Sequence, residues 1–256
     1  MHPLLVRILT GFMPTKAMRR AFRSKYINNS DGINIVSYCQ SNRIIVVQKD
    51  GTEIQKQSIE GCRIEFYGKN STVKIHEPYH FENCTFKVGD NNFIEIGRTR
   101  YSILNFIMPY PMKEKSKLFI GKDFSCMDCQ LFLHDEPNIT IKIGEDCQFS
   151  FGIIIWPSDG HTILDGDGRI LNKGEDIYIG NHVWLGMNST VLKGARIPDN
   201  SVVGAKSVFT RGSNPCPTCV KGGVYIGTPA KLFKSGIAWD RRNPYDYDRE
   251  VNNENS

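Results

Sequence analysis

The feature that most constrains this chain is a six-residue period in its last third. From residue 179 an aliphatic or aromatic residue occupies every sixth position: Ile179, Leu185, Val191, Ile197, Val203 and Phe209. A small or β-branched residue follows four places after each: Val183, Ser189, Ala195, Ser201, Ser207 and Ser213. Six fits neither the helical period of about 3.6 nor a simple two-residue alternation. It fits a short strand followed by a bend, in units that bury their inner face by stacking. The period predicts an all-β parallel solenoid.

A weaker form of the period runs upstream. Ile143, Phe149 and Ile155 keep the register, as do Ile120 and Cys126. We therefore expect irregular coils from about residue 30 rather than a separate domain. Insertions on a solenoid are where substrates and partners bind. Three stretches interrupt the pattern: residues 98–117, 156–178 and 213–223.

The charge of the chain is concentrated at its N-terminus. The chain has 256 residues, enough for one domain with a sizeable core, and a net charge of +5. Residues 1–30 hold no acid and six cations, Arg7, Lys16, Arg19, Arg20, Arg23 and Lys25. We predict a basic amphipathic helix over residues 1–26, which either caps the domain or contacts anionic lipid. The near-neutral remainder argues against a nucleic-acid-binding body.

The N-terminus lacks the features of a secretory signal, and no apolar stretch approaches the ~18 residues of a membrane-spanning helix. The sequence therefore predicts a cytoplasmic protein, at the inner face of the membrane if the arm binds lipid. Disulfides are not expected in that compartment. The pairs Cys126/Cys129 and Cys216/Cys219 lie too far apart for a zinc ribbon, so no metal is expected. Because Cys126 holds an inward repeat position, we expect the two thiols of its pair to point in different directions.

The segment IYIGNHVWLGMNSTVLKGARIPDNSVVGAKSVFTRG resembles the hexapeptide-repeat transferases, and GVYIGTPAKLF resembles the element that closes their helix. Parallel crossovers are right-handed in nearly all proteins, but the resemblance implies a left-handed β-helix. It is strong over residues 156–240 and general over residues 30–155. It predicts a left-handed β-helix acyltransferase domain over residues 27–235. The segment over residues 236–256 is rich in Asp, Asn, Arg and Tyr, a composition that predicts a polar, partly disordered tail.

The insertion WPSDGHTILDGDGRILNKGEDIYIG places His161 in a polar loop between Asp159 and Asp165. Transfer of an acetyl group to a hydroxyl needs a base near neutral pH, and a carboxylate such as Asp159 can orient a neutral imidazole. The segments SDGHTILD and HVWLG resemble the capsule and lipopolysaccharide sugar O-acetyltransferases. The resemblance implies that His161 deprotonates the acceptor, which attacks the thioester of acetyl-coenzyme A directly. His182, at the outward end of a predicted strand, ranks second.

Two further residues follow His182. Trp184 takes an outward position, where it either joins a subunit interface or, as the resemblance implies, packs at the acetyl and pantetheine end of the cofactor. The Gly186 amide is a candidate donor to the thioester oxygen, and an ordinary repeat glycine is the alternative.

The same resemblance implies a homotrimer with coenzyme A sites between subunits. On the motif GAKSVFTR it assigns pantetheine contacts to Ala205 and Thr210 and a phosphate contact to Arg211, with Lys231 as the second phosphate candidate. The chain departs from the family pattern at SNPCPTCVKGG, where simpler members have a short turn.

Four functions compete on this reading. The leading one is acetyl transfer to a hydroxyl of a surface-polysaccharide sugar as the carbohydrate acceptor. The others are N-acetylation of a nucleotide-linked amino sugar, a zinc hydrase with three converging histidines, and a non-catalytic solenoid.

Overall fold

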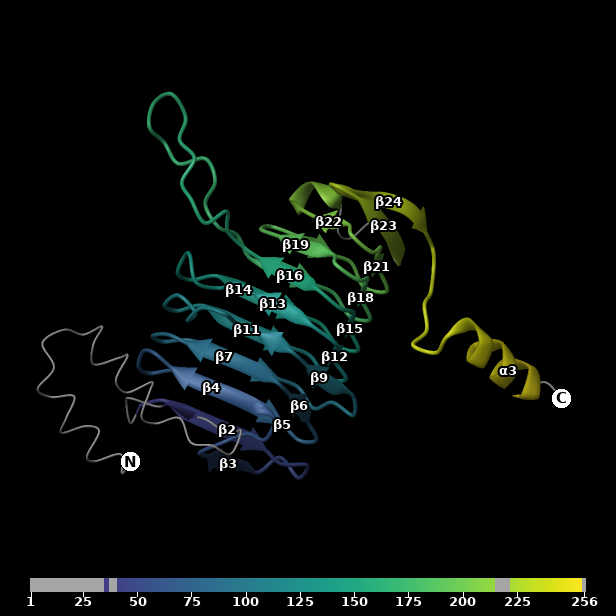
Figure 1. Cartoon of the computed structure of the whole chain (residues 1–256), viewed down its shortest axis with the longest axis horizontal. Coiled ribbons are helices and arrows are strands. Elements are labelled where there is room, and N and C mark those ends of the chain that lie inside the picture. The colour runs from purple at the N-terminus through teal and green to yellow at the C-terminus, as the bar shows by residue number, and fades with distance from the viewer. Residues whose placement is uncertain (1–34, 37–40, 215–221, 255–256) are drawn as a thin grey trace, which may run out of the picture.

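The computed structural model describes residues 35–36, 41–214 and 222–254 (Figure 1). The helix predicted over residues 1–26, its lipid contact and the pair Cys216/Cys219 lie outside the described residues. In the part of the chain that is described, no helix has both the length and the apolar character needed to cross a membrane.

The described strands form three sheets of eight strands each. Sheet A contains β1 (Ile35–Val36), β4 (Cys62–Phe66), β7 (Cys84–Val88), β10 (Phe106–Ile107), β13 (Cys129–Leu131), β16 (Ile153–Trp156), β19 (Thr190–Leu192) and β22 (Val208–Phe209). Sheet B contains β3 (Glu53–Lys56), β2 (Arg43–Val47), β5 (Thr72–His76), β8 (Phe93–Ile96), β11 (Lys117–Ile120), β14 (Thr140–Ile143), β17 (Ile177–Ile179) and β20 (Arg196–Ile197). Sheet C contains β6 (His80–Glu82), β9 (Ser102–Leu104), β12 (Ser125–Cys126), β15 (Gln148–Phe149), β18 (Trp184–Leu185), β21 (Val202–Val203), β23 (Gly223–Gly227) and β24 (Ala230–Ser235).

The pairing between strands shows how the chain visits these sheets. From β4 to β22 each strand pairs in parallel with the strand three places along, for example β14 with β17 and β15 with β18. Three consecutive strands therefore make one coil, and the coils stack along one axis (Figure 1). Among the named strands of the described residues, antiparallel pairs occur only at the ends of sheets, β2 with β3 and β23 with β24.

The core is the pair of columns that the six-residue period predicts. All twelve column residues from Ile179 to Ser213 are buried, with exposed fractions of 5% or less. The upstream positions Ile143, Phe149 and Ile155 are buried in the same way. Large side chains on the strands and small ones before the next strand fill a narrow interior, as close packing requires.

The corners between strands need residues that tolerate a left-handed backbone. One residue per coil has positive φ between sheets B and C: Asp123 at 56°, Asp146 at 53°, His182 at 53° and Asn200 at 56°. Asn, Asp and His are the side chains enriched in this region. The same corner carries a column of glycines, because a Cβ on Gly144 would lie 2.4 Å from the carbonyl oxygen of Gly180.

The N-terminal half differs from the prediction of irregular coils. Its strands in sheets A and B are often four or five residues long, and they pair in the same order as those of the later coils. Residues 98–117, predicted as an insertion, contain β9 and β10 and so belong to a regular coil. An early coil takes 22 residues, from Ile64 to its partner Phe86, whereas a later coil takes 18, from Tyr178 to its partner Arg196, and this difference hides the six-residue period.

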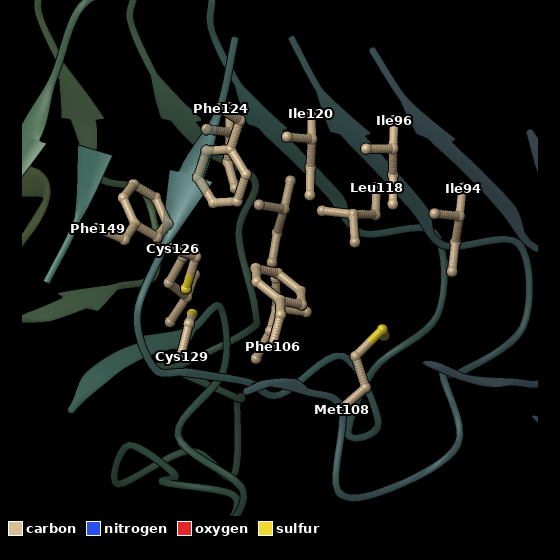
Figure 2. Close-up of a cluster of buried hydrophobic side chains, with 14 of the residues drawn as sticks. Ile94, Ile96, Phe106, Met108, Leu118, Ile120, Phe124, Cys126, Cys129 and Phe149 are labelled. Atoms are coloured by element: carbon tan, nitrogen blue, oxygen red, sulfur yellow. The ribbon is translucent and has the colours of Figure 1, made fainter. Parts of the chain in front are cut away.

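The predicted divergence of the thiols of Cys126 and Cys129 is wrong. Both side chains point into the core, with exposed fractions of 1% and 0% (Figure 2). The chain bends between sheets C and A at this point, so two residues three apart can both face inward. Burial, and then the neighbouring Cys129, raise the pKa of the Cys126 thiol well above its usual value. Among the described residues, no cluster of three metal-binding side chains occurs.

The structure describes the predicted C-terminal tail as far as residue 254. Residues 237–243 cross the corner between sheets B and C, where they contact earlier coils. They lead into α3 (Pro244–Glu254), which projects from the stack (Figure 1).

Candidate functional site

The predicted insertion around His161 is a hairpin that projects beyond the stack between β16 and β17 (Figure 1). Its two legs meet through a bridge between Leu164 and Ile170. The Asp165 carboxylate closes the tip by accepting hydrogen bonds from the amides of Asp167 and Arg169, both at 2.9 Å. The hairpin is therefore a formed structure rather than a loose loop.

The base of the hairpin is held from the coil below. Glu136 Oε1 accepts a hydrogen bond from Ser158 Oγ on the outgoing leg at 3.1 Å. The same oxygen accepts one from the amide of Gly174 on the returning leg at 2.6 Å. Next to it, the Asp135 carboxylate accepts a hydrogen bond from Trp156 Nε1 at 2.7 Å. The Glu136 carboxylate thus holds both legs of the hairpin together.

The coil above holds the hairpin too. Lys193 Nζ donates hydrogen bonds to the Asp159 carboxylate and, at 3.1 Å, to the carbonyl oxygen of Asn172. The side-chain nitrogen Nδ2 of Asn172 donates to the Asp159 carboxylate at 2.9 Å and to the carbonyl oxygen of His161 at 2.7 Å. These contacts fix the backbone at His161 without using its side chain.

The His161 side chain is exposed, and in the described residues its ring nitrogens have no hydrogen-bond partner. Asp159, predicted as the carboxylate that orients it, is bound instead to Lys193 and Asn172. The ammonium of Lys193 holds the pKa of Asp159 below its usual value. The structure thus places Asp159 in the hairpin base and does not bring it to the imidazole.

Trp184 and Gly186 lie on and just after β18, on another side of the prism. Trp184 is 36% exposed, and its indole nitrogen is 3.4 Å from Ser150 Oγ. The Gly186 amide donates to the carbonyl oxygen of Val203 at 2.8 Å, so its hydrogen is not available to a thioester oxygen. A Cβ on Gly186 would lie 2.8 Å from the amide nitrogen of Ala205. Close stacking of two coils explains this glycine, and the predicted oxyanion role is not supported.

The predicted cofactor contacts lie on the last coils. Ala205 is exposed one coil beyond Gly186, and the Thr210 amide donates to Ser213 Oγ at 2.9 Å. Arg211 forms an ion pair with Glu175, at the edge of a groove of about 910 Å³. Lys231 is exposed on β24, and no described acidic side chain pairs with its ammonium.

His182, the second-ranked histidine, is part of the framework. Its Nδ1 is 2.7 Å from Asp146 Oδ2, and its Nε2 is 3.0 Å from the carbonyl oxygen of Trp239. The Trp239 ring stacks on the imidazole, with 4.1 Å between centroids and 12° between planes. Both ring nitrogens and one ring face are occupied, so His182 has no free nitrogen to act as a base.

Sequence reasoning missed Trp239 and Arg241. The Arg241 guanidinium donates to Asp146 Oδ1 at 2.9 Å, to Ser125 Oγ at 2.7 Å and to the Cys147 carbonyl at 3.1 Å. It also lies over the Tyr101 ring, 4.2 Å from its centroid. The only signal in the sequence was a tryptophan in an otherwise polar segment.

Comparisons with known proteins agree with this architecture. The family described as "Bacterial transferase hexapeptide (six repeats)" matches residues 176–211. The chain is 33% identical to a polysialic acid O-acetyltransferase of Neisseria meningitidis over 198 residues, which is 68% of this chain and 88% of the relative. A polysialic acid O-acetyltransferase of Escherichia coli O1:K1 / APEC is 30% identical over 127 residues, 49% of this chain and 39% of the relative.

A solved structure shares the fold. The polySia-specific acetyltransferase NeuO superposes with a TM-score of 0.61 at 21% identity, over 87% of this chain and 100% of that chain. The repeat match, the long alignment with the Neisseria relative and the three parallel sheets lead to one assignment. The chain belongs to the hexapeptide-repeat acyltransferase family.

Proposed function

We propose that the protein transfers an acetyl group from acetyl-coenzyme A to a hydroxyl of a surface-polysaccharide sugar. The observation that carries the proposal is the free imidazole of His161, held on a fixed hairpin in a chain related to polysialic acid O-acetyltransferases. A third relative, from Escherichia coli (strain K12), is 50% identical over 58 residues, 23% of this chain and 26% of the relative, and is named as a putative lipopolysaccharide biosynthesis O-acetyl transferase.

In this mechanism a ring nitrogen of His161 takes the proton from the acceptor hydroxyl. The hydroxyl oxygen attacks the thioester carbonyl, the carbon–sulfur bond breaks, and the imidazolium returns its proton to the departing thiolate. The His161 ring is exposed and has no partner in the described part of the chain, which suits a group that must meet an acceptor from solvent. Glu136, Asn172 and Lys193 hold the backbone that carries it, which supplies positioning.

We further propose that the working enzyme is a homotrimer with the donor between subunits. His161 leaves the stack between sheets A and B, whereas Trp184 lies on sheet C. Because the two residues lie on different sides of one prism, a site that uses both would combine His161 of one copy with Trp184 of a neighbouring copy. The hairpin also carries four exposed aliphatic side chains that a neighbour would cover, Ile163, Leu164, Ile170 and Leu171.

We also propose that the coil is left-handed, which the family relationship supports. For the donor phosphates, Lys231 is the stronger candidate, because Arg211 is already paired with Glu175. Trp184 remains proposed at the acetyl end of the donor, with Ala205 and Thr210 along the pantetheine arm.

Replacement of His161 by alanine tests the mechanism. With acetyl-coenzyme A and a glycan panel, release of free thiol should fall at least about 10²-fold, because a general base contributes that much. His80→Ala, at an exposed histidine on β6, is the matched histidine control for thiol release. Thiol release by His161→Ala at the wild-type rate would exclude the mechanism, and acetylation of amino sugars alone would favour N-acetylation.

A further inference from the structure

A groove of about 820 Å³ lies between β18 and α3. The C-terminal segment forms one wall, and Trp184 and Gln148 on sheet C form the other. The groove therefore opens beside the residue that we place at the acetyl end of the donor. Nothing in the mechanism above uses this space.

Three aromatic side chains line the groove: Trp184, Trp239 and Tyr247. Trp239 is fixed by its stack on His182 and by a hydrogen bond from Nε1 to the carbonyl oxygen of His182 at 2.8 Å. Its ring centroid is 6.0 Å from that of Trp184, with 41° between planes. Rigid aromatic walls suit a ligand that presents both apolar and polar faces, as a sugar ring does.

The two arginines of the groove are already neutralised. Arg241 pairs with Asp146 at 2.9 Å. Arg242 donates to both carboxylate oxygens of Asp240 at 2.9 Å and to Glu250 at 2.5 Å. The paired guanidinium lowers the pKa of Asp240 to about 2, so this pair stays ionised at neutral pH. Neither arginine is left as an open site for an anion.

Asp248 gives the groove its remaining charge. It lines the groove, it is exposed, and no cation among the described residues pairs with it. An unpaired carboxylate accepts hydrogen bonds from hydroxyl groups and repels phosphates and carboxylates. The charge pattern therefore disfavours the phosphates of coenzyme A in this groove and favours an uncharged ligand rich in hydroxyls.

We propose that this groove is an acceptor subsite for an uncharged sugar unit. The sugar packs on the aromatic walls, and its hydroxyls donate hydrogen bonds to Asp248. The role of the bound sugar as part of the acceptor rests on the proposed function. Binding of the sugar in the groove does not depend on acetyl transfer. The assignment also separates this chain from an enzyme whose subsite takes sialic acid, because that sugar carries a carboxylate.

Tryptophan fluorescence of the full chain, titrated without any acyl donor, tests the subsite. The probes are maltotriose, mannotriose and galactotriose, with α2,8-linked disialic acid as the anionic probe. We expect at least one neutral trisaccharide to change the fluorescence saturably and to bind more tightly than disialic acid. Asp248→Asn should weaken that binding about tenfold, as loss of a hydrogen bond to a charged group does.

Tyr247→Ala should also weaken binding, whereas Tyr245→Ala is the matched control. Tyr245 lies two residues away on α3, is 74% exposed and does not line the groove. The proposal is overturned if no neutral trisaccharide binds, if disialic acid binds best, or if Asp248→Asn and Tyr247→Ala bind like the wild type. If the protein binds a neutral sugar in this way but never releases thiol from acetyl-coenzyme A, the subsite is supported and the proposed acetyl transfer is disproved.

Discussion

Glu136 and Asp159 show how single carboxylates support a side chain that they do not touch. Glu136 joins the two legs of the hairpin, and Asp159 ties one leg to Lys193 on the next coil. Each acts on the backbone below His161, so we regard both as positioning residues.

Replacement of Glu136 by alanine should lower kcat about 10–100-fold, because small errors in position are costly for proton transfer. KM for acetyl-coenzyme A should change less than about twofold, because uniform binding is not affected. Glu136→Gln, which keeps an acceptor oxygen, should recover most of the activity. Steady-state kinetics with Glu114→Ala as an exposed control checks this, and a wild-type kcat in Glu136→Ala would disprove the positioning role.

The lowered pKa of Asp159 sets the sign of its pH dependence. A carboxylate whose folded pKa lies below its unfolded value stabilises the fold above the unfolded value and loses that effect as the pH falls through the folded value. The contribution should therefore be constant from pH 5 to 8, begin to fall near the ordinary carboxyl pKa of about 4 and disappear only below the lowered folded pKa.

Hydrogen exchange of the amides of residues 160–171, corrected for intrinsic rates, measures this effect. Asp159→Asn should exchange faster than the wild type by a constant factor across pH 5–8. Asp167→Asn, at the exposed tip, is the control. A factor that grows or shrinks across this range would contradict the assignment of the ion pair.

At the scale of elements, the coils from β14 onward could be predicted because one large and one small residue alternate in a fixed register. Residues 98–117 could not, since the coil that contains them takes 24 residues, from Phe93 to its partner Lys117, instead of three times six. The docked C-terminal segment could not be predicted either. Its order depends on Arg241 reaching Asp146 and Ser125 on two earlier coils, and such contacts leave no local pattern.

In the candidate site too, local features could be predicted from the sequence, whereas contacts between coils could not. His161 lies in an insertion, which interrupts the period and is visible in the sequence. The partner of Asp159 is not visible, because Lys193 lies 34 residues away and meets it only when two coils stack. Gly186 was misjudged as a donor for a related reason, since its hydrogen bond to Val203 belongs to the next coil.

The glycine column gives a prediction about stacking. Gly144→Ala should destabilise the protein by about 1–3 kcal/mol, because the new Cβ would lie 2.4 to 2.7 Å from backbone atoms of the next coil. Gly166→Ala, which has open space around its Cβ, should change stability by less than about 0.5 kcal/mol. Denaturant unfolding of both variants measures the difference, and equal midpoints would refute the packing argument.

At the scale of the whole molecule, a site shared between copies can be tested by complementation. If the proposed trimer holds, the His161→Ala and Trp184→Ala proteins should each be nearly inactive alone. After unfolding and refolding together in equal amounts, about one quarter of the interfaces should combine the intact His161 of one chain with the intact Trp184 of another. Thiol release should return to about that fraction of wild-type activity. Absence of recovery, with mixed trimers shown by mass spectrometry, would place the whole site in one chain.

The antiparallel strands β3 and β24 have a consequence for the length of the molecule. A parallel stack offers unpaired amides and carbonyls at each end, and another chain could extend it indefinitely. β3 ends sheet B at one end of the stack, and β24 ends sheet C at the other. Each reverses direction and so presents a ladder that a further parallel coil cannot continue in register. On sheet C, removal of β24 would therefore expose β23 as an edge to which another chain could add a strand.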